Sequence, residues 1–255
     1  MVGLASIHNK PKGWPSTHRH KLASLKIVKQ KDVNRGITGT LKVTLKDGKV
    51  VHDASVQRID EFKQMFQPQG GKAELNFKDT YKFNMAAYDL AKMIGIGDMV
   101  PAHAQRSYGG TNASFSWWID DFMFEEGDRV KQNASSPNQD AWVKENDVIR
   151  VFDQLIANTD RNAGNLIIDK QWRVWIIDHT RAFRIQKDLR NPGALTRVDR
   201  TMLEKMKALD EPGLKKQLGK YLNNAEIQGL LARRDLIVAA FAARGESALI
   251  DRPKR

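Results

Sequence analysis

Side chains that carry oxygen atoms lie at the ends of two apolar runs in the segment QLIANTDRNAGNLIIDKQWRVWIIDHTRAF, residues 154–183. Asp160 lies in the polar stretch NTDRNAGN, Asn165 opens the run NLIID, and Asp178 closes the run WRVWIID. The two runs flank the turn KQ, which predicts a two-stranded hairpin. Antiparallel pairing brings the start of the first strand and the end of the second to one edge. We therefore expect Asn165 and Asp178 to lie side by side, with Asp160 in the loop that leads into the hairpin.

This set of side chains favours a particular chemistry. Carboxylate and amide oxygens without a surrounding histidine or cysteine cluster suit Mg²⁺ better than zinc. An Asp/Asn pair that holds Mg²⁺, next to an Asp that orients a hydroxyl nucleophile, is the arrangement used in phosphoryl transfer. Each residue alone is more simply explained as a turn or cap residue. Their combination around an apolar hairpin favours a metal–phosphate site.

The spacing D-x-x-x-x-N, a hairpin and then a closing Asp resembles the catalytic segment of the protein-kinase-like superfamily. NTDRNAGNLIID is similar to the Asp-Arg-His-x-x-Asn loop of phosphatidylinositol 3- and 4-kinase-like proteins and HipA-type bacterial kinases, and IDHT stands where those families have Asp-Phe-Gly or a variant. FKDTYKFNMAAYDLAKMIGIGDMVPAH also resembles them, so the likeness extends over about residues 35–184. It implies ATP and Mg²⁺ as cofactors, Asp160 as the catalytic aspartate, Asn165 as a metal ligand and Asp178 as the principal Mg²⁺ ligand.

The sequence departs from the family at several positions. Asn162 replaces the loop histidine, and Thr180 replaces the glycine after Asp178. A kinase also needs a strand lysine for the phosphates and a helix glutamate that holds it. Our candidate for the lysine is Lys78, after AELNF; the competing placement on HDASVQRID puts Gln57 there and leaves the site without its cation.

The expected helix offers Asn84 where the family has glutamate. Because an amide forms no ion pair, Lys78 would need another partner, for which the nearby acids are Glu61, Glu74 and Asp79. These departures favour two alternatives on the same fold: a pseudokinase or nucleotide-binding scaffold, and an AMP transferase.

Further nucleotide contacts are expected from the β-rich half. Gly36 and Gly39 in NRGITGT precede a strand, so their backbone N–H groups could cover phosphates, although two glycines opening a hairpin are also typical of a simple turn. Trp118 in SFSWWIDD is expected to line an adenine slot. Its neighbour Trp117 is a further candidate, but strand alternation sends the two side chains to opposite faces, so core packing explains at least one of them. Arg181 and Arg184 are either substrate contacts or solvated side chains.

The element pattern predicts an α+β, two-lobed protein-kinase-like fold. Two β-rich runs flank the Asp-Gly turn KDGK, a helix with one apolar face starts near residue 79 and stops at Gly95, and the second half is mainly helical with a loop at residues 128–141. The expected units are a basic arm, a β-rich N-lobe and a helical C-lobe, at residues 1–31, 32–121 and 122–255.

Composition sets the outer limits. The 255 residues carry a net charge of +12 and no cysteine, which excludes disulfides, thiolate zinc sites and a cysteine nucleophile. Residues 1–31 hold seven Lys and Arg but no acid, which predicts a solvated leader or, alternatively, contact with nucleic acid or an anionic membrane surface. No run is apolar enough to span a membrane. The default expectation is a cytoplasmic enzyme whose acceptor is a hydroxyl on a protein, lipid head group or small molecule.

Overall fold

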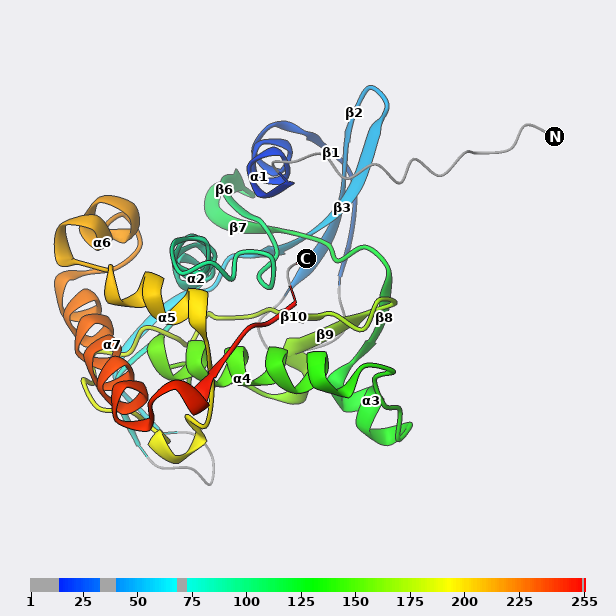
Figure 1. Ribbon diagram of the computed structural model, residues 1–255. Coiled ribbons are helices and arrows are strands. Elements are labelled where there is room, and N and C mark those ends of the chain that lie inside the picture. Colours follow the sequence, from blue (N-terminus) through cyan, green and yellow to red (C-terminus); the bar gives the residue numbers. More distant parts are fainter. Residues whose placement is uncertain (1–13, 33–39, 68–72, 254) are drawn as a thin grey trace.

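The computed structural model describes residues 14–32, 40–67, 73–253 and 255 (Figure 1). The expected phosphate-covering residues Gly36 and Gly39, and residues 1–13 of the basic arm, lie outside the described residues. The described chain forms a β-rich lobe and a mainly helical lobe, and a short segment after Trp117 connects them. The predicted α+β, two-lobed architecture is thereby confirmed.

The β-rich lobe is built on a five-stranded antiparallel sheet with the order β1-β2-β3-β7-β6. Its strands in that order are Lys26–Asp32, Leu41–Asp47, Val50–Gln57, Thr111–Trp117 and His103–Tyr108. Gly48, with φ +51°, closes the predicted KDGK turn, a conformation that costs glycine little. On β3, Ala54 and Val56 enter the core, whereas Ser55 and Gln57 are only partly buried. Alternation therefore leaves a polar row opposite the apolar face.

Helix α2 (Tyr81–Met93) packs beside this sheet and is buried along most of its length. The Thr80 hydroxyl accepts a hydrogen bond from the Lys82 N–H at 3.2 Å and so caps the first turn. Gly95, with φ +81°, follows the helix end as predicted. The buried side chains of α2 and the apolar side of the sheet belong to one core.

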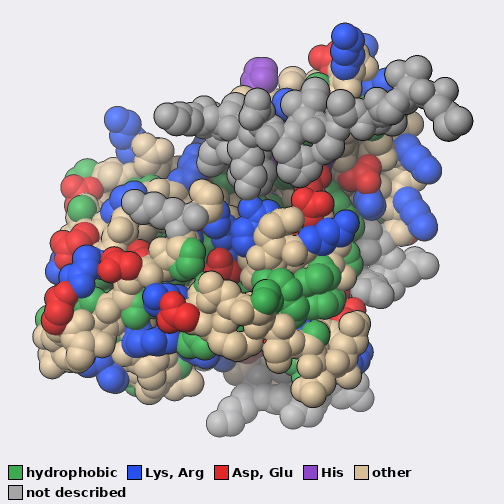
Figure 2. All heavy atoms as spheres, turned by 45° about the vertical axis from the view of Figure 1, so that its right-hand side comes forward, with side chains coloured by type: hydrophobic (Ala, Val, Ile, Leu, Met, Phe, Trp, Pro, Cys, Tyr) green, Lys and Arg blue, Asp and Glu red, His purple; other side chains and the backbone are tan. Residues whose placement is uncertain are grey.

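The described part of the basic arm is docked on the lobe. Helix α1 (Trp14–Ser24) buries Leu22 completely. The Arg19 guanidinium donates to both Asp89 carboxylate oxygens, at 2.7 and 3.0 Å, and to the His103 carbonyl. This docking differs from the solvated leader that charge alone predicts, because charge says nothing of the apolar residues that anchor the helix. Figure 2 shows Lys and Arg side chains spread over one face of the molecule and interleaved with Asp and Glu.

A two-stranded antiparallel ribbon lies between β3 and α2 in the sequence and does not join the five-stranded sheet. We call it the β4–β5 ribbon; its strands are Asp60–Phe66 and Glu74–Thr80. The sequence predicted a strand at AELNF but not its partner, whose side chains are nearly all exposed. At the end of β5, the Thr80 N–H donates to the Thr180 carbonyl at 2.9 Å. The ribbon thus connects the N-terminal half to the segment that follows Asp178.

The second lobe holds a three-stranded sheet and most of the helices (Figure 1). The sheet consists of β8 (Phe122–Glu125), β9 (Leu166–Asp169) and β10 (Val174–Ile176). The helices are α3 (Glu126–Lys131), α4 (Gln139–Leu155), α5 (Arg200–Lys207), α6 (Glu211–Leu218) and α7 (Asn224–Arg244). A short parallel pair, β11 (Val198–Asp199) and β12 (Leu249–Ile250), completes it.

The loop expected at residues 128–141 is shorter than predicted because α3 enters it. Arg129 pairs with both Glu126 carboxylate oxygens, at 2.6 and 2.7 Å, and donates to the Ala134 carbonyl. These i,i+3 contacts support a single short helix. Among the described helices, none combines the length and apolar character needed to cross a membrane.

Candidate active site between the lobes

The catalytic-loop segment and the hairpin adopt the predicted arrangement. Leu166 pairs with Ile176, and the Ile177 N–H donates to the Asn165 carbonyl at 3.1 Å. Asp178 follows Ile177 directly, so Asp178 and Asn165 lie at the same end of the hairpin. The Asn165 side-chain Nδ2 donates to the Asp160 carbonyl at 2.9 Å. The structure thus brings Asp160, Asn165 and Asp178 together, and it turns the Asn165 amide oxygen away from the Asp160 backbone.

An arginine that sequence reasoning missed holds this loop in shape. The Arg161 guanidinium donates to both carboxylate oxygens of Asp153 at 3.0 Å, to the Asn165 carbonyl at 3.0 Å and to the Ile177 carbonyl at 2.8 Å. The Arg161 and Asp153 side chains are 14% and 13% exposed. A largely desolvated bidentate pair of this kind fixes geometry. The only sequence signal was an arginine directly after the catalytic-loop aspartate.

Asp178 is held in a sparsely populated backbone conformation. Its φ is +52°, in the left-handed region that residues other than glycine seldom adopt. The Thr180 hydroxyl donates to Asp178 Oδ1 at 3.0 Å, and the Thr180 N–H approaches the same oxygen at 3.4 Å. Such strained positions concentrate at functional sites. Thr180, which replaces the glycine of the family pattern, thus supports the Asp178 carboxylate directly.

Negative charge exceeds positive charge around these residues. Burial raises the pKa of Asp160, and the carboxylates of Asp178 and Glu74 add to this while Arg181 opposes it. Burial likewise raises the pKa of Asp79 on β5, which also faces Asp178 and Asp160. The described cations near these carboxylates are Arg161, which pairs with Asp153, and Arg181 and Arg184, which pair with Glu74. Five carboxylates against three guanidinium groups leave a deficit that a divalent cation would offset.

The donor chemistry fits Mg²⁺. Within the described ranges, no three His, Asp or Glu side chains lie close enough to form a metal centre by themselves. A metal ion would therefore take Asp178, the amide oxygen of Asn165 and oxygens of water or phosphate. Mg²⁺ is commonly bound in this way, by one or two carboxylates with waters and substrate phosphates.

On the side of the candidate site opposite the hairpin, β3 and α2 contribute a pair of amide side chains. Asn84 of α2 donates through Nδ2 to Gln57 Oε1 of β3 at 2.5 Å, and its Oδ1 accepts from the His179 N–H at 2.7 Å. Asn84 is fully buried. Asn84 thus contacts Gln57 and not Lys78, so the geometry agrees with the competing placement of the strand position at Gln57.

Lys78 lies instead on the β4–β5 ribbon. Its Nζ is 2.6 Å from Glu226 Oε1 of α7, a carboxylate with 3% side-chain exposure. None of the three nearby acids that the sequence suggested as partners is the one it contacts. Lys78 therefore fastens the ribbon to the helical lobe in this structure. The two partners are 148 residues apart, so no local pattern could have predicted the pair.

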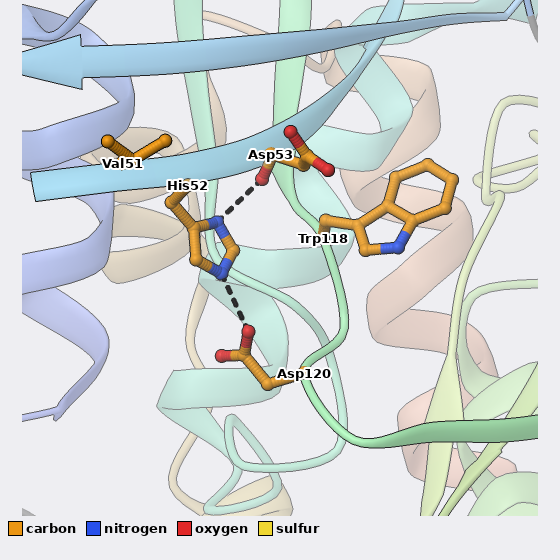
Figure 3. A pocket seen from close by; sticks show the side chains of 5 residues that line it. All are labelled: Val51, His52, Asp53, Trp118 and Asp120. Carbon is orange, nitrogen blue, oxygen red and sulfur yellow. Dashed lines mark hydrogen bonds and ion pairs between the residues drawn. The ribbon is translucent and has the colours of Figure 1, made fainter. Parts of the chain in front are cut away.

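Trp118 lies in the connection between the lobes and lines a pocket of about 270 Å³. Figure 3 shows His52 between the Asp53 carbonyl and the Asp120 carboxylate, with the Trp118 indole across the pocket. Lys42 places its ammonium 4.1 Å from the Trp118 ring centroid and 2.9 Å from Asp53 Oδ2. The base slot expected at Trp118 thus has charged neighbours.

Two aromatic side chains near the site are packed in the interior. Trp117 is 8% exposed and stacks with His52, at 3.6 Å between ring centroids, which is the core role that alternation predicts for at least one of the two tryptophans. His179 is fully buried, as a packed residue should be, and burial holds its pKa well below the usual range.

Comparison with known proteins identifies the fold. No family model matches the sequence, and no curated protein matches it. Among solved structures, a hydra Fam20 protein with sugar superposes with a TM-score of 0.67 at 13% identity, covering 98% of this chain and 96% of that one. The Golgi casein kinase superposes with a TM-score of 0.60 at 12% identity, covering 96% and 80%. The chain has the kinase-like fold; the resemblance to the atypical, phosphatidylinositol-kinase-like proteins stays a prediction.

Proposed function

We propose that this protein is a phosphotransferase that uses ATP and Mg²⁺ to phosphorylate a hydroxyl acceptor, in the manner of the atypical, phosphatidylinositol-kinase-like enzymes. The observation that carries the proposal is the closing of the hairpin, which sets Asp178 beside Asn165 and holds both next to the Asp160 loop. The kinase-like fold supports it. Residues 32–121 would cover the nucleotide, and residues 122–255 would supply the metal and acceptor side.

Each site residue has a defined task under this proposal. Asp178 and Asn165 would hold the metal, which neutralises phosphate charge when bound. Asp160, whose side chain is 47% exposed, is accessible to an acceptor hydroxyl. Its carboxylate would accept the hydroxyl proton while the acceptor oxygen bonds to the γ-phosphorus and ADP leaves. Arg181 Nη1 lies 3.9 Å from Asp160 Oδ1 and would favour the charged form of that carboxylate.

A second candidate is a pseudokinase that binds nucleotide without turnover. The pairing of Gln57 with Asn84 favours it, because two neutral amides supply no cation for the α- and β-phosphates. Under this alternative the charged hairpin would still bind metal and nucleotide. The two candidates therefore differ in transfer and agree in binding.

The test is label transfer from γ-labelled and α-labelled ATP in the presence of Mg²⁺. Acceptors would be the chain itself, dephosphorylated casein and phosphoinositide vesicles. We expect γ-label transfer that Asp160→Asn lowers by about 10²-fold or more, as loss of a general base does. Asp188→Asn, an exposed acid of the same segment, is the matched control.

The other outcomes are equally informative. Transfer of the α-label would show that the protein transfers AMP and not phosphate. Absence of both labels from every acceptor, with nucleotide binding intact, would establish the pseudokinase. Equal γ-label transfer by wild type and Asp160→Asn would contradict the role given to Asp160.

A further inference from the structure

An unpartnered carboxylate lies behind the candidate metal site, on an element that the catalytic motif does not include. Asp79 belongs to β5 of the β4–β5 ribbon and is 7% exposed. Its Oδ1 is buried and has no hydrogen-bond partner within the described residues. Burying a charged oxygen without compensation is costly. A structure that keeps one in place therefore points to a ligand.

We infer that Asp79 is an additional ligand of the divalent cation, bound directly or through one of its waters, so that the β4–β5 ribbon completes the metal site. The inference rests on the metal site of the proposed function and extends it. It assigns to the ribbon a role in cation binding that the motif around Asp160, Asn165 and Asp178 does not provide.

The Thr180 hydroxyl fixes the distance between Asp79 and the motif. It donates to Asp178 Oδ1 at 3.0 Å and lies within hydrogen-bond reach of the Asp79 carboxylate as well. Two carboxylate oxygens that share one hydroxyl lie within about 6 Å of each other. Mg²⁺ binds oxygen at about 2.1 Å and usually keeps several waters, so a hydrated ion spans this separation.

A single hydroxyl cannot donate to both carboxylates at once, and Asp79 Oδ1 has no partner among the described residues in either case. Thr180 has one O–H proton, and the Asp178 oxygen already receives it. The ribbon backbone holds Asp79 in place, because the Thr80 N–H donates to the Thr180 carbonyl at 2.9 Å. The Asp79 carboxylate is therefore positioned but not satisfied.

The neighbouring side-chain cations form their described ion pairs with acids other than Asp79. Lys78, the adjacent residue, pairs with Glu226 at 2.6 Å. Arg181 and Arg184 pair with Glu74 at 2.7 and 2.6 Å. Arg181 is near enough to Asp79 to oppose the rise of its pKa, but the described ion pairs of Arg181 are with Glu74 and Asp160. A divalent ion from solution could therefore still bind the unpartnered Asp79 Oδ1.

Protonation is the competing explanation. Burial raises the pKa of Asp79, and the nearby Asp178 adds to the effect. A protonated Asp79 would be a structural residue, and its replacement would leave metal affinity unchanged. The two explanations therefore predict different results for metal binding in the absence of turnover.

The experiment is a Mn²⁺ titration followed by the paramagnetic resonance of the unbound ion, with and without a non-hydrolysable ATP analogue. The variants are Asp79→Asn, Asp79→Leu and Asp178→Asn. Glu61→Gln is the matched control, because Glu61 faces Asp79 across the ribbon but is 52% exposed. We expect Asp79→Asn to weaken Mn²⁺ binding at least tenfold and Asp79→Leu at least as much, while Glu61→Gln matches the wild type.

Unfolding curves of the metal-free proteins add a second readout. Removing an unpaired buried charge should leave Asp79→Leu at least as stable as the wild type without metal, yet less stabilised by Mn²⁺. If Asp178→Asn loses Mn²⁺ and both Asp79 variants bind it normally, the inference is overturned and the proposed function stands. If the wild type binds no Mn²⁺ in either condition, the metal site itself is overturned.

Discussion

The two walls of the candidate site, the hairpin on one side and β3 with α2 on the other, are held together by different kinds of interaction. The hairpin wall depends on charge: Arg161 clamps Asp153 and two backbone carbonyls, and acids surround Asp178. The wall formed by β3 and α2 depends on neutral amides, with Gln57 bound to Asn84. Both walls meet at the residue after Asp178, where the His179 N–H donates to Asn84.

This difference shows that a neutral amide at position 84 can connect α2 both to β3 and to the hairpin segment. A carboxylate at position 84 would only accept hydrogen bonds, whereas an amide both donates and accepts. Asn84 uses both abilities, one toward Gln57 and one toward His179. Asn84 therefore connects β3 to the residue after Asp178, and neither amide of the pair carries a positive charge.

The largest effect is expected on the charged wall. Arg161→Met leaves Asp153 largely buried without its partner, so it should lower the free energy of unfolding by about 3–5 kcal/mol. Urea unfolding measures the change. Lys215→Met is the control: Lys215 pairs with Glu211 on the surface, where such a pair contributes about 0–1 kcal/mol. Similar losses in the two variants would mean that the clamp adds nothing beyond a surface pair.

The amide wall is tested by rebuilding the ion pair. Asn84→Glu or Gln57→Lys alone introduces a charge into a buried contact and should destabilise the protein. The double variant Gln57→Lys/Asn84→Glu should recover stability, with a coupling energy of about 1–3 kcal/mol in a double-mutant cycle. It should also bind ATP more tightly than the wild type. A coupling energy near zero would show that the two positions do not form the pair that the structure places there.

A smaller effect is expected in the pH dependence of the free energy of unfolding, to which each wall contributes one buried histidine. Burial lowers the pKa of His103, on β6 beside α2, to about 4, and burial also lowers that of His179. Both stay neutral in the folded protein, while the unfolded chain gains protons below about pH 6.5. Stability is therefore lost as the pH falls from about 6.5 toward 4, by at most about 1.4 kcal/mol per pH unit for each histidine.

Urea unfolding between pH 7 and 5 measures this slope. His103→Gln should reduce it by removing the titrating group on the sheet side. His179→Phe should reduce it on the hairpin side and, because both ring nitrogens lack partners among the described residues, should not lower stability at pH 7. Slopes equal to that of the wild type would contradict neutral burial of these rings.

Local patterns predicted the hairpin wall well. The apolar runs around the turn KQ specify strand pairing, and pairing places Asn165 and Asp178 at one edge without any long-range information. Thr80 and Gly95 likewise mark the ends of α2 through capping and turn chemistry. The kinase-like fold was predicted from the resemblance of the segment around these residues to the protein-kinase-like superfamily.

The rest depends on contacts that no local pattern encodes. Strand β4 is polar and nearly fully exposed, so it lacks the alternation by which strands are recognised. Lys78 was our candidate for the strand lysine, but it pairs with Glu226 from the far end of the chain. The role of Asp79 appears only when the ribbon is placed against Thr180. Tertiary placement decided these cases.

The most direct test of the central claim is the thermal stability of wild type and Asp178→Ala, each with and without ATP and Mg²⁺. A ligand at about 100 times its dissociation constant adds roughly 2.7 kcal/mol of stability. We predict a stabilisation of that order in the wild type that requires Mg²⁺ and is absent from Asp178→Ala. No stabilisation of the wild type, or an equal one in both proteins, would contradict a metal–nucleotide site at this hairpin.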